Sequence, residues 1–174
     1  GNFGMVREAL EVLATKNIKF RFVIVGAQHY EPLKKYFENS PFETIYIDEL
    51  DWRDATCTPK MIQKYQFDVG LLPLMDIPIS RAKCAYKAIE YMACGVPVVT
   101  NSVGENKIVV KDGETGFVAD TAEGWANCIS KLLADKNLRI KIGQEGIERV
   151  QNIYSYNAVI PQYKPILFDS KAIS

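Results

Sequence analysis

Glu90 is the side chain whose type and surroundings most favour a binding role. It stands in a segment where Ala85, Ala88, Ile89 and Met92 recur at close to helical spacing, so its neighbours are mostly apolar. A carboxylate held in such a place can accept hydrogen bonds from the two hydroxyl groups of a ribose. The alternative interpretation is a surface ion pair with Lys87, which would contribute roughly 0.3 kcal/mol.

The start of the same segment offers groups that bind anions. Cys84, Ala85 and Tyr86 are expected to open the helix, where free backbone N–H groups and the helix dipole favour a phosphate. The small side chains of Cys84 and Ala85 would allow a diphosphate to approach closely. Lys83 and Lys87 could add positive charge, although two solvated lysines are an equally good interpretation.

The elements that must position these groups follow an alternating pattern. Gly95 is expected to end the helix, and Pro97 then leads into an apolar strand over 96–100. Earlier and later strands are expected at 20–25, 44–47, 69–72 and 116–119. Helices are expected at 5–15, 31–38, 55–65, 106–110, 121–134 and 137–153, a loop at 73–80, and a helical or irregular segment at 156–168.

This alternation predicts an α/β fold, a Rossmann-like parallel sheet with helices on both faces. In such sheets ligands bind beyond the carboxyl ends of the strands. The segments that reach this edge are 26–30, 48–53, 73–87 and 101–106. The helix that carries Glu90 begins in one of them.

Composition argues against several classes of ligand. The 174 residues carry 21 basic and 21 acidic side chains, so no global basic surface calls for nucleic acid. The four cysteines form no Cys-x-x-Cys pair and there is one histidine, so neither a structural zinc site nor another bound metal is expected. Free thiols, no signal peptide and no apolar run of membrane-spanning length together suggest a reduced, cytoplasmic setting.

Several motifs, taken in order, resemble the C-terminal nucleotide-sugar domain of GT-B glycosyltransferases. The likeness is to the large group 1, or GT4, family of retaining enzymes, and it covers most of the chain. The motifs that carry it are Phe67–Leu74, Lys83–Lys87, Glu90–Val99, Val103–Asn106, Asp112–Val118 and the closing Tyr154-Ser155.

The resemblance implies a domain organisation. Residues 1–155 would form the donor-nucleotide domain, with its first strand expected to be missing, and 156–174 a C-terminal helical tail. The intact enzyme would move a sugar from a nucleoside diphosphate sugar to an acceptor held by a separate N-terminal domain, which could also bring it to the inner face of a membrane. No cofactor or metal is implied, and the fragment alone is expected to be inactive.

The resemblance also implies roles for single residues. Glu90 matches the acid that binds the ribose, and Leu50-Asp51-Trp52 matches a loop that contacts the base. Trp52 could stack on that base or simply pack under its loop. Asn2 belongs to a stretch, Gly1–Gly4, that is similar to a phosphate-binding loop. Family members often carry a second glutamate eight positions before the first, but that position here is Ala82.

Three other functions are alternatives to donor binding. The absence of an acid at Ala82 favours a nucleotide-binding or interaction module that has lost catalysis. A sugar-nucleotide epimerase would need histidines and carboxylates in characteristic places, but His29 is the only histidine and is expected to be structural or solvated. An oxidoreductase is disfavoured because no Gly-x-Gly-x-x-Gly follows Gly26. Asp76, which follows the third expected strand in the loop 73–80, is a minor candidate for a residue that lines the ligand site.

Overall fold

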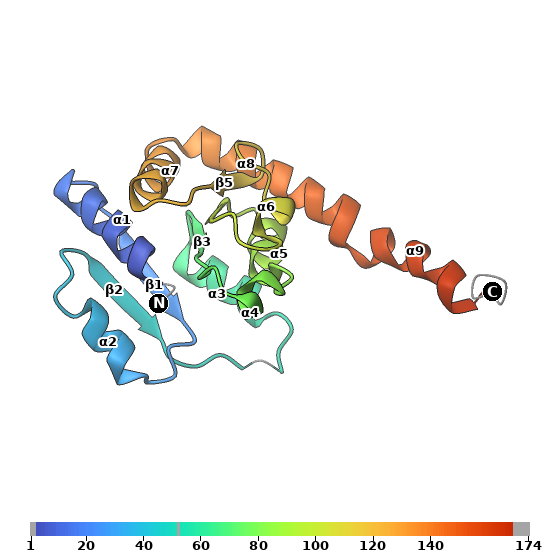
Figure 1. Cartoon of the computed structure of the whole chain (residues 1–174), viewed down its shortest axis with the longest axis horizontal. Helices are drawn as coiled ribbons and strands as arrows, with labels where there is room; N and C mark the ends of the chain where they lie inside the picture. The colour runs from blue at the N-terminus through green and yellow to red at the C-terminus, as the bar shows by residue number, and fades with distance from the viewer. Residues whose placement is uncertain (1–2, 52, 169–174) are drawn as a thin grey trace.

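The computed structural model describes residues 3–51 and 53–168. Five strands alternate with helices along this part of the chain (Figure 1). The strands are β1 (Arg21–Val25), β2 (Glu43–Ile47), β3 (Gly70–Leu72), β4 (Val98–Thr100) and β5 (Gly116–Val118). The helices are α1 (Phe3–Thr15), α2 (Glu31–Phe37), α3 (Cys57–Tyr65), α4 (Pro78–Arg81), α5 (Tyr86–Ala93), α6 (Asn106–Val109), α7 (Ala122–Ala134), α8 (Lys136–Arg149), η1 (Val150–Tyr154) and α9 (Tyr156–Phe168).

All strand pairs are parallel, which confirms the predicted α/β class. The strands do not form one continuous sheet, however. β1 pairs with β2, and separately β3, β4 and β5 form a three-stranded sheet in that order. Within residues 3–51 and 53–168 no described strand joins β1 to β3, so the parallel strands fall into two groups.

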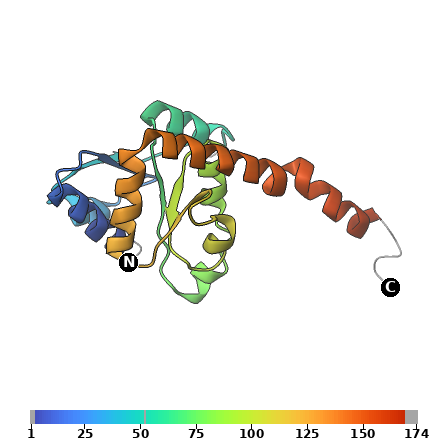
Figure 2. The same cartoon turned by 90° about the horizontal axis from the view of Figure 1, so that it is seen from above.

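Helices cover both faces of the strands (Figure 2). On one face, Val6, Leu10 and Leu13 of α1 pack with Trp125 and Ile129 of α7 in the largest apolar cluster. On the other face a smaller cluster holds Met61 and Ile62 of α3 and Val96, which precedes β4. The site-bearing helix α5 adds Ala88 and Met92 to a third cluster with Val98 and Val110.

Local differences from the sequence-based expectations have clear causes. Residue 85 is left-handed, with φ +52°, so α5 begins at Tyr86 and not at residue 84. The expected loop 73–80 contains the short helix α4, whose first residue is Pro78, a favourable position for proline. The strand expected from Val96 begins at Val98, because the Val96 amide donates to the Tyr91 carbonyl and still belongs to the turn after α5.

The C-terminal part forms a long helical arm. The expected helix 137–153 is split into α8 and the π-helical segment η1, and α9 then runs away from the body (Figure 1). None of the residues of α9 is buried, although Pro161 and Pro165 lie inside it. The division of the chain after residue 155 stays a prediction. Among the described helices, none combines the length and apolar character needed to cross a bilayer.

Candidate functional site

Glu90 occupies a position that is more buried than a surface ion pair would require. Its side chain is 20 % exposed, and Oε2 lies 2.6 Å from Lys87 Nζ, one turn earlier on α5. Within the described residues Oε2 is nevertheless a buried oxygen that accepts no well-aligned hydrogen bond. The pairing with Lys87 expected from the helical spacing is therefore present, and it leaves acceptor capacity on a buried carboxylate.

The beginning of α5 presents backbone N–H groups that have no acceptor among the described residues. Ala85 is buried and caps the helix with its carbonyl, which accepts from the Ala88 amide at 2.9 Å. The amides of Cys84, Ala85 and Tyr86 donate to no acceptor within residues 3–51 and 53–168. The Lys83 amide, by contrast, is used by the Ser80 carbonyl at 3.2 Å. Cys84 and Tyr86 have exposed side chains, whereas Ala85 between them is buried.

Close backbone contacts fix α5 in place. The Tyr91 ring packs on Gly70 of β3, where a Cβ would come within 2.7 Å of the ring. Gly95, which ends the helix with φ +72°, lies against Gly143 of α8 so closely that a Cβ on Gly143 would stand 2.1 Å from the Gly95 carbonyl oxygen. Both contacts hold the C-terminal part of the helix, which includes the turn that carries Glu90.

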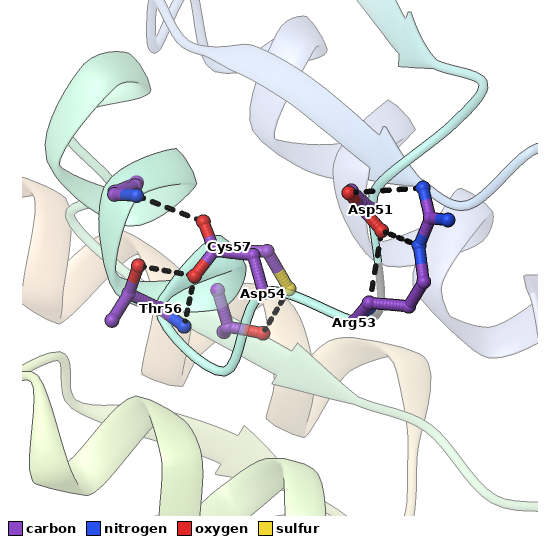
Figure 3. Close-up of polar contacts among 7 residues, drawn as sticks. Asp51, Arg53, Asp54, Thr56 and Cys57 are labelled. Atoms are coloured by element: carbon purple, nitrogen blue, oxygen red, sulfur yellow. Dashed lines mark hydrogen bonds and ion pairs between the residues drawn. The ribbon is translucent and has the colours of Figure 1, made fainter.

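Figure 3 shows the loop before α3, where Asp51 and Asp54 each form a local polar cluster. Asp51 accepts from the Arg53 backbone N–H at 3.1 Å and from Nε at 2.9 Å, and these bonds lower the pKa of its carboxyl. Asp54 accepts from Thr56 Oγ1 at 2.6 Å and Lys60 Nζ at 2.8 Å, which hold its pKa well below the usual range. The Asp51 carboxylate is thus engaged within its own loop.

A cavity of about 980 Å³ brings three of the predicted site residues together, namely Leu50, Lys87 and Glu90. Tyr91 also lines it, and burial, with a smaller effect of the Glu90 charge, raises the pKa of the Tyr91 hydroxyl. Lys83, Cys84, Ala85, Tyr86 and Asp51 lie outside its lining. Asn2 and Trp52, also predicted to bind the nucleotide, lie outside the described residues.

Three buried polar residues that sequence reasoning missed fix the carboxyl ends of β3 and β4. Asn101 bridges to Leu74, accepting from its N–H at 3.0 Å and donating to its carbonyl at 2.6 Å. Thr100 Oγ1 donates to the Leu72 carbonyl at 2.9 Å and accepts from Asn106 Nδ2 at 2.6 Å. Their signal in the sequence was the polar run directly after an apolar strand. They set the path of the loops that flank the start of α5.

His29 and Asp76, the other two polar side chains considered from the sequence, do not line this cavity. His29 Nδ1 lies 3.1 Å from Asp48 Oδ2, and this contact links the loops after β1 and β2. Asp76 pairs with Arg81 at 2.5 Å, and both are exposed. Within residues 3–51 and 53–168, no three His, Cys, Asp or Glu side chains converge as metal ligands do.

Comparison with known proteins identifies the family. The sequence profile described as "Glycosyl transferases group 1" matches residues 2–135. The chain belongs to the group 1 glycosyltransferases. A D-inositol 3-phosphate glycosyltransferase from Corynebacterium aurimucosum is 31 % identical over 102 residues, which cover 58 % of this chain and 24 % of that protein. The chain spans about a quarter of the length of such curated relatives.

Solved structures agree on the fold of this group 1 glycosyltransferase chain. The C-terminal domain of a group 1 family protein from Francisella tularensis superposes with a TM-score of 0.68 at 19 % identity, covering 87 % of this chain and 78 % of that domain. HepE from Anabaena, solved in complex with UDP-glucose, gives a TM-score of 0.69 at 15 % identity, covering 94 % of this chain and 44 % of that one.

Proposed function

We propose that this chain binds a nucleoside diphosphate sugar as the donor half of a retaining glycosyltransferase. The acceptor would be held by a separate N-terminal domain, and the intact enzyme would transfer the sugar to it. Family membership supports sugar transfer in general, and the UDP-glucose bound to the structurally similar HepE supports a nucleotide-sugar donor.

The observation that carries the proposal is the largely buried Glu90 carboxylate in the cavity wall, whose Oε2 lies 2.6 Å from Lys87 Nζ and accepts no well-aligned hydrogen bond within the described residues. Burying a charged acceptor without full hydrogen bonding is costly, so such groups point to a missing partner. A ribose diol supplies two hydroxyl donors that a carboxylate can accept together. Leu50, in the same cavity wall, would then contact the base.

The diphosphate would lie at the start of α5. The unpartnered amides of Cys84, Ala85 and Tyr86 would donate to its oxygens, and the positive end of the helix dipole would favour its charge. Lys83 and Lys87 would add cationic charge beside it. As the sugar leaves, negative charge grows on the diphosphate, and these fixed donors would stabilise that charge in the transition state.

Calorimetry with UDP, GDP and ADP tests the donor site directly. We expect the chain to bind one nucleotide selectively, and Glu90→Gln to weaken that binding by about 10- to 100-fold, the equivalent of losing a charge-assisted hydrogen bond. Glu8→Gln, an exposed carboxylate on α1, is the matched control and should leave affinity unchanged. Equal affinity of the Glu90→Gln variant and the unmodified chain would refute the assignment of Glu90.

A second candidate is a nucleotide-binding module without transferase activity. Ala82 favours it, because this exposed residue at the end of α4 stands where family members often carry a second glutamate. The chain joined to its N-terminal domain should consume a nucleotide sugar in the presence of acceptor if it is an enzyme. Saturable nucleotide binding without consumption would favour the module.

A further inference from the structure

Two buried polar residues tie the end of β4 to the segment that leads into α5. Asn101 is 5 % exposed, and its side chain bonds to both backbone groups of Leu74, accepting from the N–H at 3.0 Å and donating to the carbonyl at 2.6 Å. Thr100, which is fully buried, donates from Oγ1 to the Leu72 carbonyl at 2.9 Å. Asn101 therefore extends the pairing of β3 and β4 by one side chain and fixes where the segment 73–85 leaves the sheet.

The loop after β4 touches this segment a second time, at the end of α4. Gly104 has φ +57°, and a Cβ on it would lie 2.8 Å from the carbonyl oxygen and 3.0 Å from the Cα of Arg81. Glycine adopts this backbone conformation freely and has no side chain to prevent so close an approach. The loop 101–106 thus holds the segment 73–85 near its start and again shortly before Cys84.

The loop 101–106 is itself anchored from two other sides. Ser102 donates to the Asp120 carboxylate from its backbone N–H at 2.8 Å and from its hydroxyl at 2.7 Å. Asn106, fully buried at the start of α6, donates from Nδ2 to Thr100 Oγ1 at 2.6 Å. Buried polar networks of this kind rigidify the backbone that they join. The loop is therefore a firm support for the segment beside it.

The segment 73–85 needs such support to keep its shape. The hydrogen bonds around α4 are local, such as that from the buried Ser80 amide to the Ile77 carbonyl at 2.9 Å, so they turn the chain without placing it on the sheet. Ala85 is left-handed, with φ +52°, a conformation that alanine rarely adopts. Such a conformation persists only where the surrounding structure imposes it. The positions of the amides of residues 84–86 therefore depend on contacts made outside them.

We propose that Asn101 and Gly104 are positioning residues of the donor site. They hold the segment 73–85 so that the amides of residues 84–86 are in place before a diphosphate arrives. Donors that are fixed in advance need no reorganisation on binding, so affinity for the phosphate groups depends on these two residues and affinity for the nucleoside does not. The ligand in this inference rests on the proposed function, whereas the fixing of the segment is a property of the free chain.

Hydrogen exchange of the ligand-free chain tests the positioning. In Asn101→Ala we expect the Ser80 amide to exchange at least 10-fold faster relative to the Leu132 amide, in the buried core of α7, than in the unmodified chain. A residue that only stabilises the fold would accelerate both amides equally. Thr115→Ala is the matched control, because Thr115 is 4 % exposed and its hydroxyl also accepts from a backbone amide, that of Lys111 at 2.9 Å. Equal acceleration of the two amides, or none at Ser80, overturns the proposal.

Nucleotide binding gives a second readout. We expect Asn101→Ala to weaken binding of the preferred nucleoside diphosphate among UDP, GDP and ADP by about 10-fold and to leave binding of the corresponding nucleoside unchanged, both measured by NMR titration. Thr115→Ala should change neither affinity. Equal weakening of both ligands overturns the proposal. If the unmodified chain binds no nucleotide, the proposed donor function fails, and hydrogen exchange alone decides whether the segment is positioned.

Two further variants keep the test decisive. Gly104→Ala, whose Cβ would displace Arg81, should change both measurements in the same direction as Asn101→Ala. Asn101→Asp keeps the acceptor for the Leu74 amide and loses the amide that donates to the Leu74 carbonyl, so it replaces Asn101→Ala in both measurements if that variant does not fold.

Discussion

At the scale of single residues, burial distinguishes Glu90 from the other acidic side chains of the candidate region. Asp51 and Asp76 are both exposed and both satisfied by an arginine close in sequence, Arg53 and Arg81. Exposed pairs of this kind contribute little to stability and do not need a ligand. Glu90 combines a lysine neighbour with a buried, under-satisfied oxygen. A polar ligand could donate the hydrogen bond that this oxygen can still accept.

Cys84 offers a chemical probe of the same region. Its thiol is exposed and its amide is one of the proposed diphosphate donors, so a bound nucleotide should cover it. We expect a saturating concentration of the preferred nucleotide to slow alkylation of Cys84 by about 10-fold, measured by mass spectrometry. Cys128, on α7, is the reference, and burial, which raises the pKa of its thiol, should keep it slow throughout.

An unchanged rate at Cys84 would contradict this placement only if calorimetry shows the nucleotide bound under the same conditions. In that event the nucleotide would lie elsewhere in the cavity, and the role of Glu90 would still be tested by its own substitution.

At the scale of elements, the turn before α3 depends on a carboxylate. The two oxygens of Asp54 accept from the Thr56 amide at 2.8 Å, the Thr56 hydroxyl and Lys60 Nζ. These bonds depress the folded-state pKa, so the ionised form stabilises the fold. By linkage this contribution is complete above the unfolded pKa of about 3.9 and is lost as pH falls toward the lower folded value.

Asp54→Asn should therefore lower the free energy of unfolding at neutral pH, and the difference from the unmodified chain should shrink as pH drops below about 4. Urea denaturation from pH 7 down to pH 3 measures this difference. If the difference in the free energy of unfolding between the two chains stays the same from pH 7 to pH 3, the carboxylate charge at residue 54 does not matter for stability.

The contact between α8 and the turn after α5 requires glycine at residue 143. A Cβ there would meet the Gly95 carbonyl oxygen at 2.1 Å, and backbone on both sides leaves little room to relax. We expect Gly143→Ala to destabilise the fold by about 3 kcal/mol or more, seen in urea denaturation. Gly4→Ala, where nothing lies within 4 Å, is the control and should be neutral or stabilising by up to about 1 kcal/mol. Similar effects of the two substitutions would contradict this account.

The order and type of nearly all elements could be predicted from the sequence, because apolar periodicity and glycine or proline signals mark them. The N-cap of α7 is one example, with Thr121 Oγ1 accepting from the Gly124 amide at 3.0 Å as the motif predicts. The start of α5 could not be predicted, since Ala85 has a left-handed conformation that alanine rarely adopts. Nor could the two bonds of Asn101, which join it to Leu74 in a loop far away in the sequence.

At the scale of the whole molecule, one cavity connects the strands of both sheets with the candidate site. Its lining runs from the apolar edges of β1 and β3 to Lys87 and Glu90 on α5. In parallel α/β sheets ligands bind at the carboxyl edge of the strands, so the polar part of this cavity, with Lys87 and Glu90, is where we expect the nucleotide.

The arm formed by α9 is expected to contribute less to the stability of the fold than η1, the segment before it. No residue of α9 is buried, and Tyr156 and Phe168 at its two ends are 85 % and 80 % exposed. Val150 and Tyr154 of η1, by contrast, pack against the apolar cluster around Met92. A chain that ends at Ser155 should therefore keep its melting temperature within about 2 °C, whereas one that ends at Arg149 should lose several degrees.

The exposed apolar side chains of α9, among them Ile160, Ile166 and Leu167, are too numerous for a helix that faces only water. The chain that ends at Ser155 should accordingly self-associate less than the full chain at the same concentration, measured by analytical ultracentrifugation. Equal loss of melting temperature in both truncations would mean that α9 packs on the body in solution. If only the longer truncation is destabilising, the folded unit ends with η1, close to the boundary after residue 155 predicted from the sequence.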